Sequence, residues 1–278
     1  MRFTRSLRGI KVFKRKEYQL ASGKVFKEKR SWTPVIVLVL AIALYVALEV
    51  TEFDFADIIK RGHQLTTIVA QLFQPDWSYL SDVIQPLLDT IKMSLFGSFA
   101  GAAVALPFAF LASSNMVHFA PVNWLVKVLF TIIRTIPTLV SALIATYLFG
   151  LGTLAGTVAI FLFSFSYVGK LLYEEIETTN LGAFEAMIAM GYTRPFAFLK
   201  GVIPNIMPFY LSTALFNFEG NVRYASILGY VGAGGLGLLI NENIGWRDYE
   251  KVGTILFVLL ITVFIIENLS RYIRRKIS

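Results

Sequence analysis

Long apolar runs alternate with short polar segments along most of the chain. Six runs of 17 to 27 residues stand out, and about 20 apolar residues are needed for a helix to cross a bilayer. The expected spans are residues 34–50, 87–113, 124–149, 154–172, 205–228 and 253–269. The pattern therefore predicts an all-α membrane protein with six transmembrane helices. Residues 34–278 form its membrane domain, in contact with lipid.

One segment between the spans, residues 174–204, still has the pattern of well-formed helix. Asn180 can cap a helix start, and Gly191 lies where a helix would end in a left-handed turn. Thr193 with Pro195 close behind predicts a second helix start, because proline is tolerated in a first turn. Pro204 then interrupts the chain before the next apolar run. A helical hairpin of this kind indicates either a docking surface or an ordinary structured loop.

Composition narrows the classes of function. The chain is 56% hydrophobic and contains no cysteine, so disulfides and thiolate metal sites are excluded. His63 and His118 are far apart and fit no metal-ligand spacing. We therefore expect no metal site and no catalytic residues.

Positive charge is concentrated at the start of the chain. Residues 1–33 hold eleven Lys and Arg and two Glu, whereas the whole chain has a net charge of +8. This basic segment should lie in the cytoplasm by the positive-inside rule, and the basic residues after 270 place the C-terminus there too. It forms either an amphipathic helix on an anionic leaflet, using Phe3, Leu7, Ile10 and Phe13, or a cationic tail. Because the charge belongs to the tail, it does not indicate nucleic-acid binding.

Two expected spans carry charged residues. Arg134 lies about 15 Å along the third span, near mid-membrane, and Pro137 should kink that helix. In the fifth span, Glu219 and Arg223 are four residues apart and can pair on one face. Counting from Asn205, the pair lies about 21 Å along the helix, toward the outer side. It is either a structural pair or, with Asn217 and Asn221, the lining of a translocation path.

A glycine-rich run follows the fifth span. Gly232, Gly234, Gly235 and Gly237 match the spacing G-x-G-x-x-G, but the strand that a dinucleotide site needs is missing. The chain has no P-loop motif either. We expect irregular backbone near the outer end of a pathway, at Gly232, Gly234 and Gly235.

The hairpin also carries a recognisable motif. Glu185 and Ala186, followed by Gly191 and then by Ile203-Pro204, resemble the EAA loop of bacterial ABC-importer permeases. The resemblance implies that this loop forms a coupling helix in a groove of an ATPase subunit. The residues it assigns to ATPase coupling are Glu185, Ala186, Gly191, Tyr192, Thr193 and Pro204.

Further motifs narrow the resemblance. The run from Phe218 to Arg223, the glycines from Gly229 to Gly237, Arg134-Thr135-Ile136-Pro137 and Pro75-Asp76-Trp77 look like the phosphonate ABC-transporter permease family. The resemblance covers roughly residues 50–270. It implies the type I ABC importer permease fold in a bacterial plasma or inner membrane.

The resemblance also implies the partners and the substrate. They are two ABC ATPase subunits that bind the ATP and Mg, a second permease copy that is identical or related, and an extracytoplasmic phosphonate-binding protein. This chain would bind no cofactor. The implied substrate is a phosphonate, phosphite or phosphate ester, an oxyanion that Arg134 and Arg223 could hold.

Other functions fit less well. An ABC importer for another small solute would share the coupling loop. An intramembrane enzyme needs a nucleophile, base or metal cluster, and the two histidines lie on opposite expected sides. An ion channel or secondary transporter needs no docking site for an ATPase. Stimulation of an ATPase by this chain would therefore argue against both alternatives.

Overall fold

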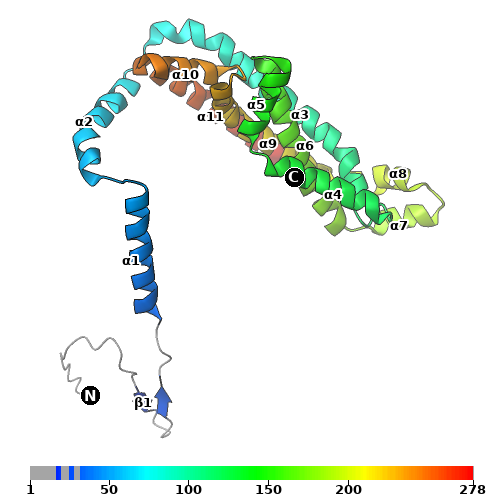
Figure 1. Ribbon diagram of the computed structural model, residues 1–278. Helices are drawn as coiled ribbons and strands as arrows, with labels where there is room; N and C mark the ends of the chain where they lie inside the picture. Colours follow the sequence, from blue (N-terminus) through cyan, green and yellow to red (C-terminus); the bar gives the residue numbers. More distant parts are fainter. Residues whose placement is uncertain (1–16, 20–24, 28–31, 278) are drawn as a thin grey trace, which may run out of the picture. The chain divides into compact units, whose positions relative to one another are not determined.

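The computed structural model describes residues 17–19, 25–27 and 32–277 (Figure 1). The chain separates into two compact units, residues 1–65 and 66–278. The expected boundary between residues 33 and 34 stays a prediction, since much of the basic segment lies outside the described residues. The proposed amphipathic face from Phe3 to Phe13 also lies outside them.

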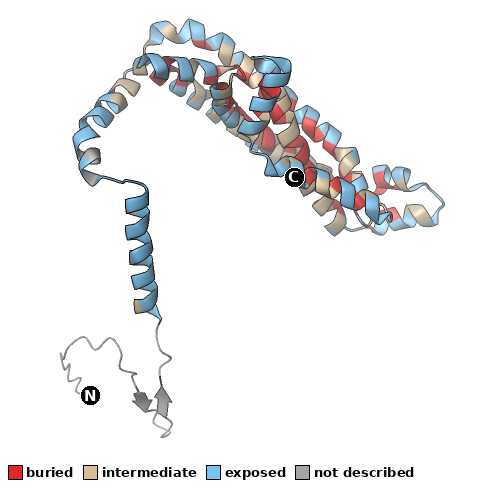
Figure 2. Ribbon diagram, viewed as in Figure 1, coloured by how far each residue is buried: buried red, intermediate tan, exposed pale blue. Residues whose placement is uncertain are grey.

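The first unit contains a short hairpin and a lipid-type helix. Strands β1 (Glu17–Gln19) and β2 (Val25–Lys27) pair antiparallel, with Tyr18 opposite Phe26. Helix α1 (Thr33–Val50) starts with proline in its first turn, and none of its residues is buried (Figure 2). Its mean hydropathy of 2.4 suits a helix covered by lipid rather than by protein. Helix α2 (Phe55–Leu72) follows.

Four long helices build the second unit. They are α3 (Leu80–Ala112), α6 (Thr153–Thr178), α9 (Ile203–Leu228) and α11 (Tyr249–Ile277). Gly97 and Gly101 of α3 have the G-x-x-x-G spacing that predicts close helix packing, and α6 approaches at this point. A Cβ on Gly97 would lie 2.7 Å from the Ile160 side chain, and one on Gly101 would lie 2.6 Å from the Phe161 carbonyl oxygen.

The helices extend past the expected spans. Helix α3 has 33 residues and α6 has 26, so the acidic run that includes Glu174 is still helical. At 1.5 Å per residue these helices are about 50 Å and 39 Å long, more than the roughly 30 Å hydrocarbon core. Hydropathy identified their apolar parts, and hydrogen bonding within the helix continues into the polar ends.

The segment before α3 is tied to the start of α11. Asp76 caps the short helix η1 (Trp77–Tyr79) by accepting hydrogen bonds from the Ser78 hydroxyl and amide at 2.6 and 3.0 Å. These bonds lower the pKa of the Asp76 carboxyl. Thr254 donates to the Asp76 carbonyl at 2.8 Å. This explains why proline, aspartate and tryptophan stand together here.

The third expected span is broken rather than kinked. Helices α4 (Ala120–Thr135) and α5 (Thr138–Phe149) meet at 90°. Pro137 offers no amide hydrogen and forces Ile136 into an extended conformation, with φ −80° and ψ 118°. The Pro137 carbonyl then accepts the first bonds of α5, from the Val140 and Ser141 amides. In the part of the chain that the structure describes, four helices are both long and apolar enough to span, and up to six spans result if each of two bent pairs counts as one.

The second bent pair is joined by the glycine-rich run. Helix α9 passes into η3 (Gly229–Val231), and α10 (Leu236–Trp246) follows. Gly232, Gly234 and Gly235 all have positive φ, so the expected irregular backbone is present. The Gly152 amide donates to the Gly232 carbonyl at 2.9 Å, and the Leu236 amide donates to Thr90 Oγ1 at 2.8 Å.

The helical hairpin expected within residues 174–204 forms largely as predicted. Helix α7 (Gly182–Ala189) begins after Asn180, whose side chain accepts from the Gly182 amide at 2.8 Å. Gly191 turns the chain with φ 87°, and α8 (Arg194–Ala197) starts after Thr193. The expected interruption at Pro204 is wrong. The π-helical segment η2 (Phe198–Val202) runs directly into α9, and Pro204 lies in the first turn, where its missing amide costs nothing.

We expect Gly237→Ala to destabilise the folded chain by about 2 to 3 kcal/mol, because overpacking at a backbone contact cannot relax through a side chain. A Cβ there would collide with the Ser226 carbonyl. Gly220→Ala is the matched control, since nothing lies within 4 Å of its added Cβ, and it should be neutral. Denaturant unfolding of both purified variants in detergent measures the difference. Equal stability would contradict the close contact between α9 and α10.

Candidate functional site

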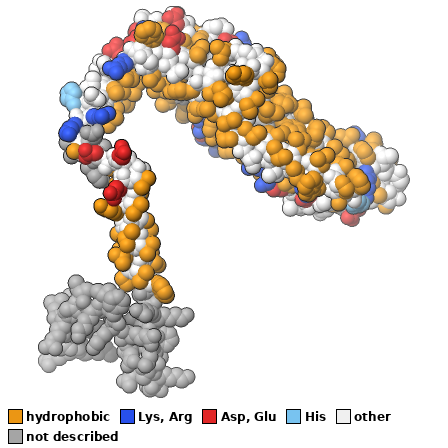
Figure 3. Space-filling view, viewed as in Figure 1, with side chains coloured by type: hydrophobic (Ala, Val, Ile, Leu, Met, Phe, Trp, Pro, Cys, Tyr) orange, Lys and Arg blue, Asp and Glu red, His pale blue; other side chains and the backbone are white. Residues whose placement is uncertain are grey.

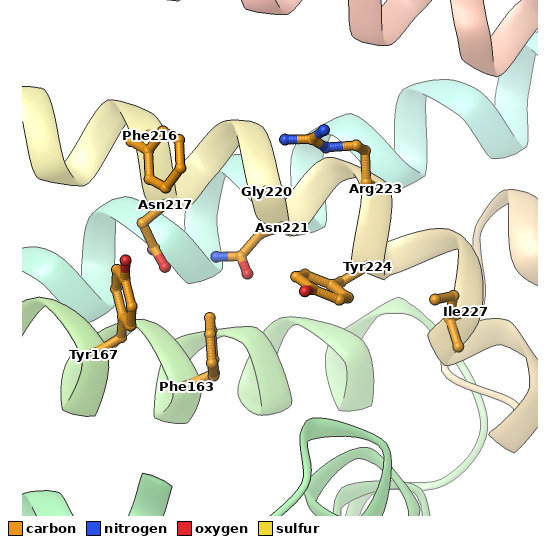
Figure 4. A pocket seen from close by; sticks show the side chains of 9 residues that line it. All are labelled: Phe163, Tyr167, Phe216, Asn217, Gly220, Asn221, Arg223, Tyr224 and Ile227. Carbon is orange, nitrogen blue, oxygen red and sulfur yellow. The ribbon is translucent and has the colours of Figure 1, made fainter. Parts of the chain in front are cut away.

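A cavity of about 450 Å³ lies between α6 and α9 (Figure 4). Asn217, Asn221 and Tyr224 project from α9 toward α6, where Phe163 and Tyr167 face them. The full lining consists of Phe163, Tyr167, Phe216, Asn217, Gly220, Asn221, Arg223, Tyr224 and Ile227. The cavity therefore combines aromatic walls with two amides, and it contains three of the expected pathway residues.

Behind the cavity lies a buried polar network. Asn221 Nδ2 donates to Ser98 Oγ of α3 at 2.8 Å and to Ser164 Oγ of α6 at 2.9 Å. Asn217 Nδ2 donates to the same Ser164 oxygen at 2.8 Å. Both serines are fully buried. Because buried polar groups need partners, the network fixes the register of three helices.

The amide oxygen of Asn217 has no hydrogen-bond partner among the described residues. The side chain is only 4% exposed, and it lines the cavity. An unpartnered buried acceptor is costly, so this oxygen has capacity left for a donor that enters the cavity. A water molecule or a protonated substrate group can supply one.

Glu219 points to the other side of α9 and contacts two arginines. Its Oε1 lies 3.2 Å from Arg223 and its Oε2 lies 3.4 Å from Arg274 of α11. The Glu219 side chain is 5% exposed, whereas that of Arg223 is 52% exposed. The pairing with Arg223 was expected from the spacing. The contact with Arg274, 55 residues away, has no signal in the local sequence.

The Arg274 contact bears on the depth expected for Glu219. Arg274 belongs to the basic end of α11, which the sequence assigns to the inner side. The contact places Glu219 beside that end of α11, so the expected inner C-terminus and the expected outward Glu219 are not both correct.

Arg134 is exposed on the surface of this chain rather than enclosed by it. It lies in the last turn of α4, just before the 90° break, and it is exposed. Its guanidinium lies over the Tyr167 ring, 5.9 Å from the ring centre. Arg223 is exposed as well, so neither cation is enclosed by this chain.

The three expected pathway glycines lie apart from the cavity lining. Gly234 is buried and would meet the Thr153 amide 2.9 Å from an added Cβ. Gly232 and Gly235 are half-buried, and their added Cβ atoms would strike Leu151 and Thr90. They pack the turn between α5 and α6 against α10.

The coupling hairpin has one buried and one exposed face. Phe184, Ala197 and Phe198 are buried in a core with Leu172 and Ile176 of α6. The other face exposes Glu185, Ala186, Gly191 and Thr193, together with the apolar residues Met190, Tyr192, Phe196 and Leu199. Tyr192 and Phe196 stack with their ring centres 5.0 Å apart. An exposed apolar patch on a structured hairpin is typical of a protein contact.

Hydrogen bonds connect this hairpin to the turn between α3 and α4. Arg194 Nη1 donates to the Met116 carbonyl at 2.7 Å. Glu177 of α6 accepts from the Ser114 amide at 2.9 Å and hydroxyl at 2.8 Å in the same turn, and from Lys127 of α4 at 2.9 Å. These links have no signal in the local sequence, because they join residues 50 or more positions apart.

Among the described residues, no group of three or more His, Cys, Asp or Glu could hold a metal ion. Hydrophobic side chains dominate the visible surface of the helices in the second unit (Figure 3). Among the polar features of the described residues, the cavity, the Glu219 cluster, Arg134 and the hairpin include the residues that the sequence singled out.

Residues 105–278 match the family described as binding-protein-dependent transport system inner membrane component. The match includes the broken third span, the hairpin and the cavity. It establishes an inner-membrane transport component that works with a binding protein and an ATPase. The alternative of an intramembrane enzyme finds no support.

The relatives include phosphorus transport proteins. The chain is 31% identical over 265 residues to the putative phosphite transport system permease protein HtxC of Stutzerimonas stutzeri, covering 93% of this chain and 92% of that protein. It is 29% identical to the phosphite transport system permease protein PtxC of the same organism, covering 86% and 87%. The phosphate-import permease protein PhnE of Mycolicibacterium smegmatis is 29% identical over 76% of this chain and 40% of its own length.

The fold has a solved counterpart. An inward-facing conformation of the MetNI methionine ABC transporter matches 73% of this chain and 99% of its own, with a TM-score of 0.65 and 23% identity. At this identity the match concerns the fold alone, and it confirms the type I ABC importer permease fold. The chain belongs to the family of binding-protein-dependent transport system inner membrane components, the permease subunits of ABC importers.

Proposed function

We propose that this chain is the permease of an ATP-driven importer for phosphite, phosphonate or a closely related phosphorus oxyanion. The observation that carries the proposal is the similarity to phosphite transport permeases over nearly the whole chain. An exposed Arg134 and an amide-lined cavity in the membrane unit agree with an anionic, hydrogen-bonding substrate.

The assembly follows from the family. Two copies of this chain, or one copy and a related permease, pair in the membrane and contact two ATPase subunits. An external protein specific for the phosphorus oxyanion delivers the substrate. The termini lie in the cytoplasm, consistent with the basic residues at both ends.

The hairpin receives the movement of the ATPases. Its exposed face, with Glu185, Tyr192 and Phe196, docks in the ATPase groove, and its buried face is packed on α6. The Arg194–Met116 bond carries the movement on to the turn before α4. Closure of the ATPases would then shift the helices as rigid bodies and open the path to alternate sides.

Within the path, the cavity between α6 and α9 is the first site that the substrate meets. Asn217 offers its unpartnered amide oxygen to a protonated oxygen of the substrate, while Phe163 and Tyr167 line the wall opposite. Glu219 holds Arg223 and Arg274 in place, so that α9 and α11 move together. Specificity resides mainly in the external binding protein.

We expect this chain, expressed with its ATPase and binding protein, to restore growth on phosphite in a phosphite-oxidising strain that lacks its own phosphite uptake. Asn217→Leu should lower the initial rate of phosphite uptake by about tenfold, a loss of roughly 1.4 kcal/mol, because the amide leaves the cavity. Asn268→Leu, an exposed position on α11, is the matched control and should transport normally. If the transporter supported growth of a methionine auxotroph on methionine but did not support growth of the matched strain on phosphite, the proposed substrate would be wrong.

A further inference from the structure

A second cavity of about 290 Å³ lies between α4 and α6. It is lined by Phe130, Thr131, Arg134, Thr135, Lys170 and Tyr173. We call these six residues the exit-side cradle. Unlike the first cavity, the cradle has two cationic side chains in its wall.

The free donors of the cradle can be identified one by one. Arg134 forms no ion pair with a carboxylate in the described part of the chain, and its guanidinium rests on the Tyr167 ring. Thr131 and Thr135 already donate to the carbonyls of Lys127 and Ile132 at 2.8 and 2.7 Å. The donors left for a ligand are therefore the Arg134 guanidinium, the Lys170 ammonium and the Tyr173 hydroxyl.

This donor set fits a small tetrahedral oxyanion. A guanidinium binds two oxygens of one phosphorus group through parallel N–H bonds, while an ammonium binds as a compact point charge. Two positive charges match the dianionic form of phosphite or an alkylphosphonate near neutral pH. Phe130 packs with its ring stacked on Tyr173, which holds the phenol in place.

The position of the cradle follows from its neighbours. On one side, Tyr167 lines the first cavity and also carries the Arg134 guanidinium. On the other side, Tyr173 packs against the core that holds Phe184 and Phe198 of the coupling hairpin. The cradle thus lies between the first cavity and the hairpin, which is the end where an imported substrate leaves.

A carboxylate beside the cradle limits its affinity. Glu174 lies 3.4 Å from Lys170, one helical turn further along α6. It shares the lysine with any bound anion and so weakens binding. A translocation site must release its substrate, and this competition supplies a means of release.

We infer that the exit-side cradle binds the phosphorus oxyanion after the first cavity and before its release to the cytoplasm. This inference rests on the proposed function for the identity of the anion. Arg134, Lys170 and Tyr173 hold the oxygens, and Glu174 competes for Lys170.

The test is titration of phosphite into the full-length permease–ATPase complex in detergent, without the binding protein and without nucleotide. Arg134→Gln and Lys170→Met should each weaken phosphite binding at least tenfold. Glu174→Gln should tighten it several-fold, a gain that a misfolded protein cannot show. Arg271→Gln, a surface cation paired with Glu267 on α11, is the control and should bind as the wild type does.

Two results separate this inference from the proposed function. If the wild-type complex imports phosphite while Arg134→Gln, Lys170→Met and Glu174→Gln all bind it like the wild type, the cradle is wrong and the proposed function stands. If phosphite binding depends on Arg134 but the complex imports no phosphorus oxyanion, the proposed function is wrong, and the cradle stands as an oxyanion site but not as a step of phosphorus import.

Discussion

Glu219→Gln should lower the free energy of unfolding by about 3 kcal/mol, the low end of the cost of removing one partner from a buried charge cluster. The substitution leaves Arg223 and Arg274 on either side of a neutral amide, where their charges repel. The low end applies because Arg223 is half exposed and reaches solvent or lipid headgroups. Denaturant unfolding of the full-length chain in detergent measures the loss.

Two controls define the origin of this loss. Glu267→Gln removes a carboxylate from the exposed Glu267–Arg271 pair and should cost less than about 1 kcal/mol. Combining Glu219→Gln with Arg274→Met removes the unpaired cation and should recover part of the stability. A double variant no more stable than Glu219→Gln alone would show that charge is not the cause.

Gly191→Val should uncouple ATP hydrolysis from uptake. Gly191 has φ 87°, a conformation that β-branched residues rarely adopt, and left-handed backbone costs other residues about 1 to 2 kcal/mol. The turn would open and shift α7 against α8. We expect phosphite uptake to fall at least tenfold while the complex still hydrolyses ATP and the binding protein still captures substrate.

Gly245→Val is the matched control for this experiment. Gly245 lies in α10 with ordinary helical backbone, and an added Cβ there meets nothing within 4 Å. Uptake by this variant should stay near the wild-type rate. Loss of substrate capture by the binding protein in Gly191→Val would contradict a role in coupling, because capture occurs at the opposite membrane face.

The sequence predicted the helices well because their signal is local. Apolar length located the spans, and Asn180, Gly191 and Pro195 located the hairpin through capping and turn chemistry. The glycines of α3 predicted close helix packing for the same reason, since a residue without a side chain lets a neighbouring helix approach at its own position. Proline was harder to interpret. Pro137 breaks a helix by 90°, whereas Pro204 lies in the first turn of α9 directly after the π-helical segment η2, and residue type alone does not distinguish the two cases.

The candidate site was less predictable because its contacts are distant in sequence. Glu219 pairs with Arg223 at helical spacing, but its contact with Arg274 depends on how α9 packs against α11. Ser98 and Ser164 meet Asn221 across three helices. Lys170 joins Arg134 at the cradle only because α4 ends beside α6. Rules about residue spacing apply within one helix, so they cannot predict contacts between different helices.

The central claim is that this chain forms the membrane path of an ATP-driven importer for a phosphorus oxyanion. The most direct measurement is phosphite accumulation in proteoliposomes that contain the permease and its ATPase, with binding protein added outside. We predict accumulation against a gradient that requires ATP inside the vesicles and is blocked by an excess of unlabelled methylphosphonate. ATP hydrolysis stimulated by the loaded binding protein, without any phosphite accumulation, would contradict the claim.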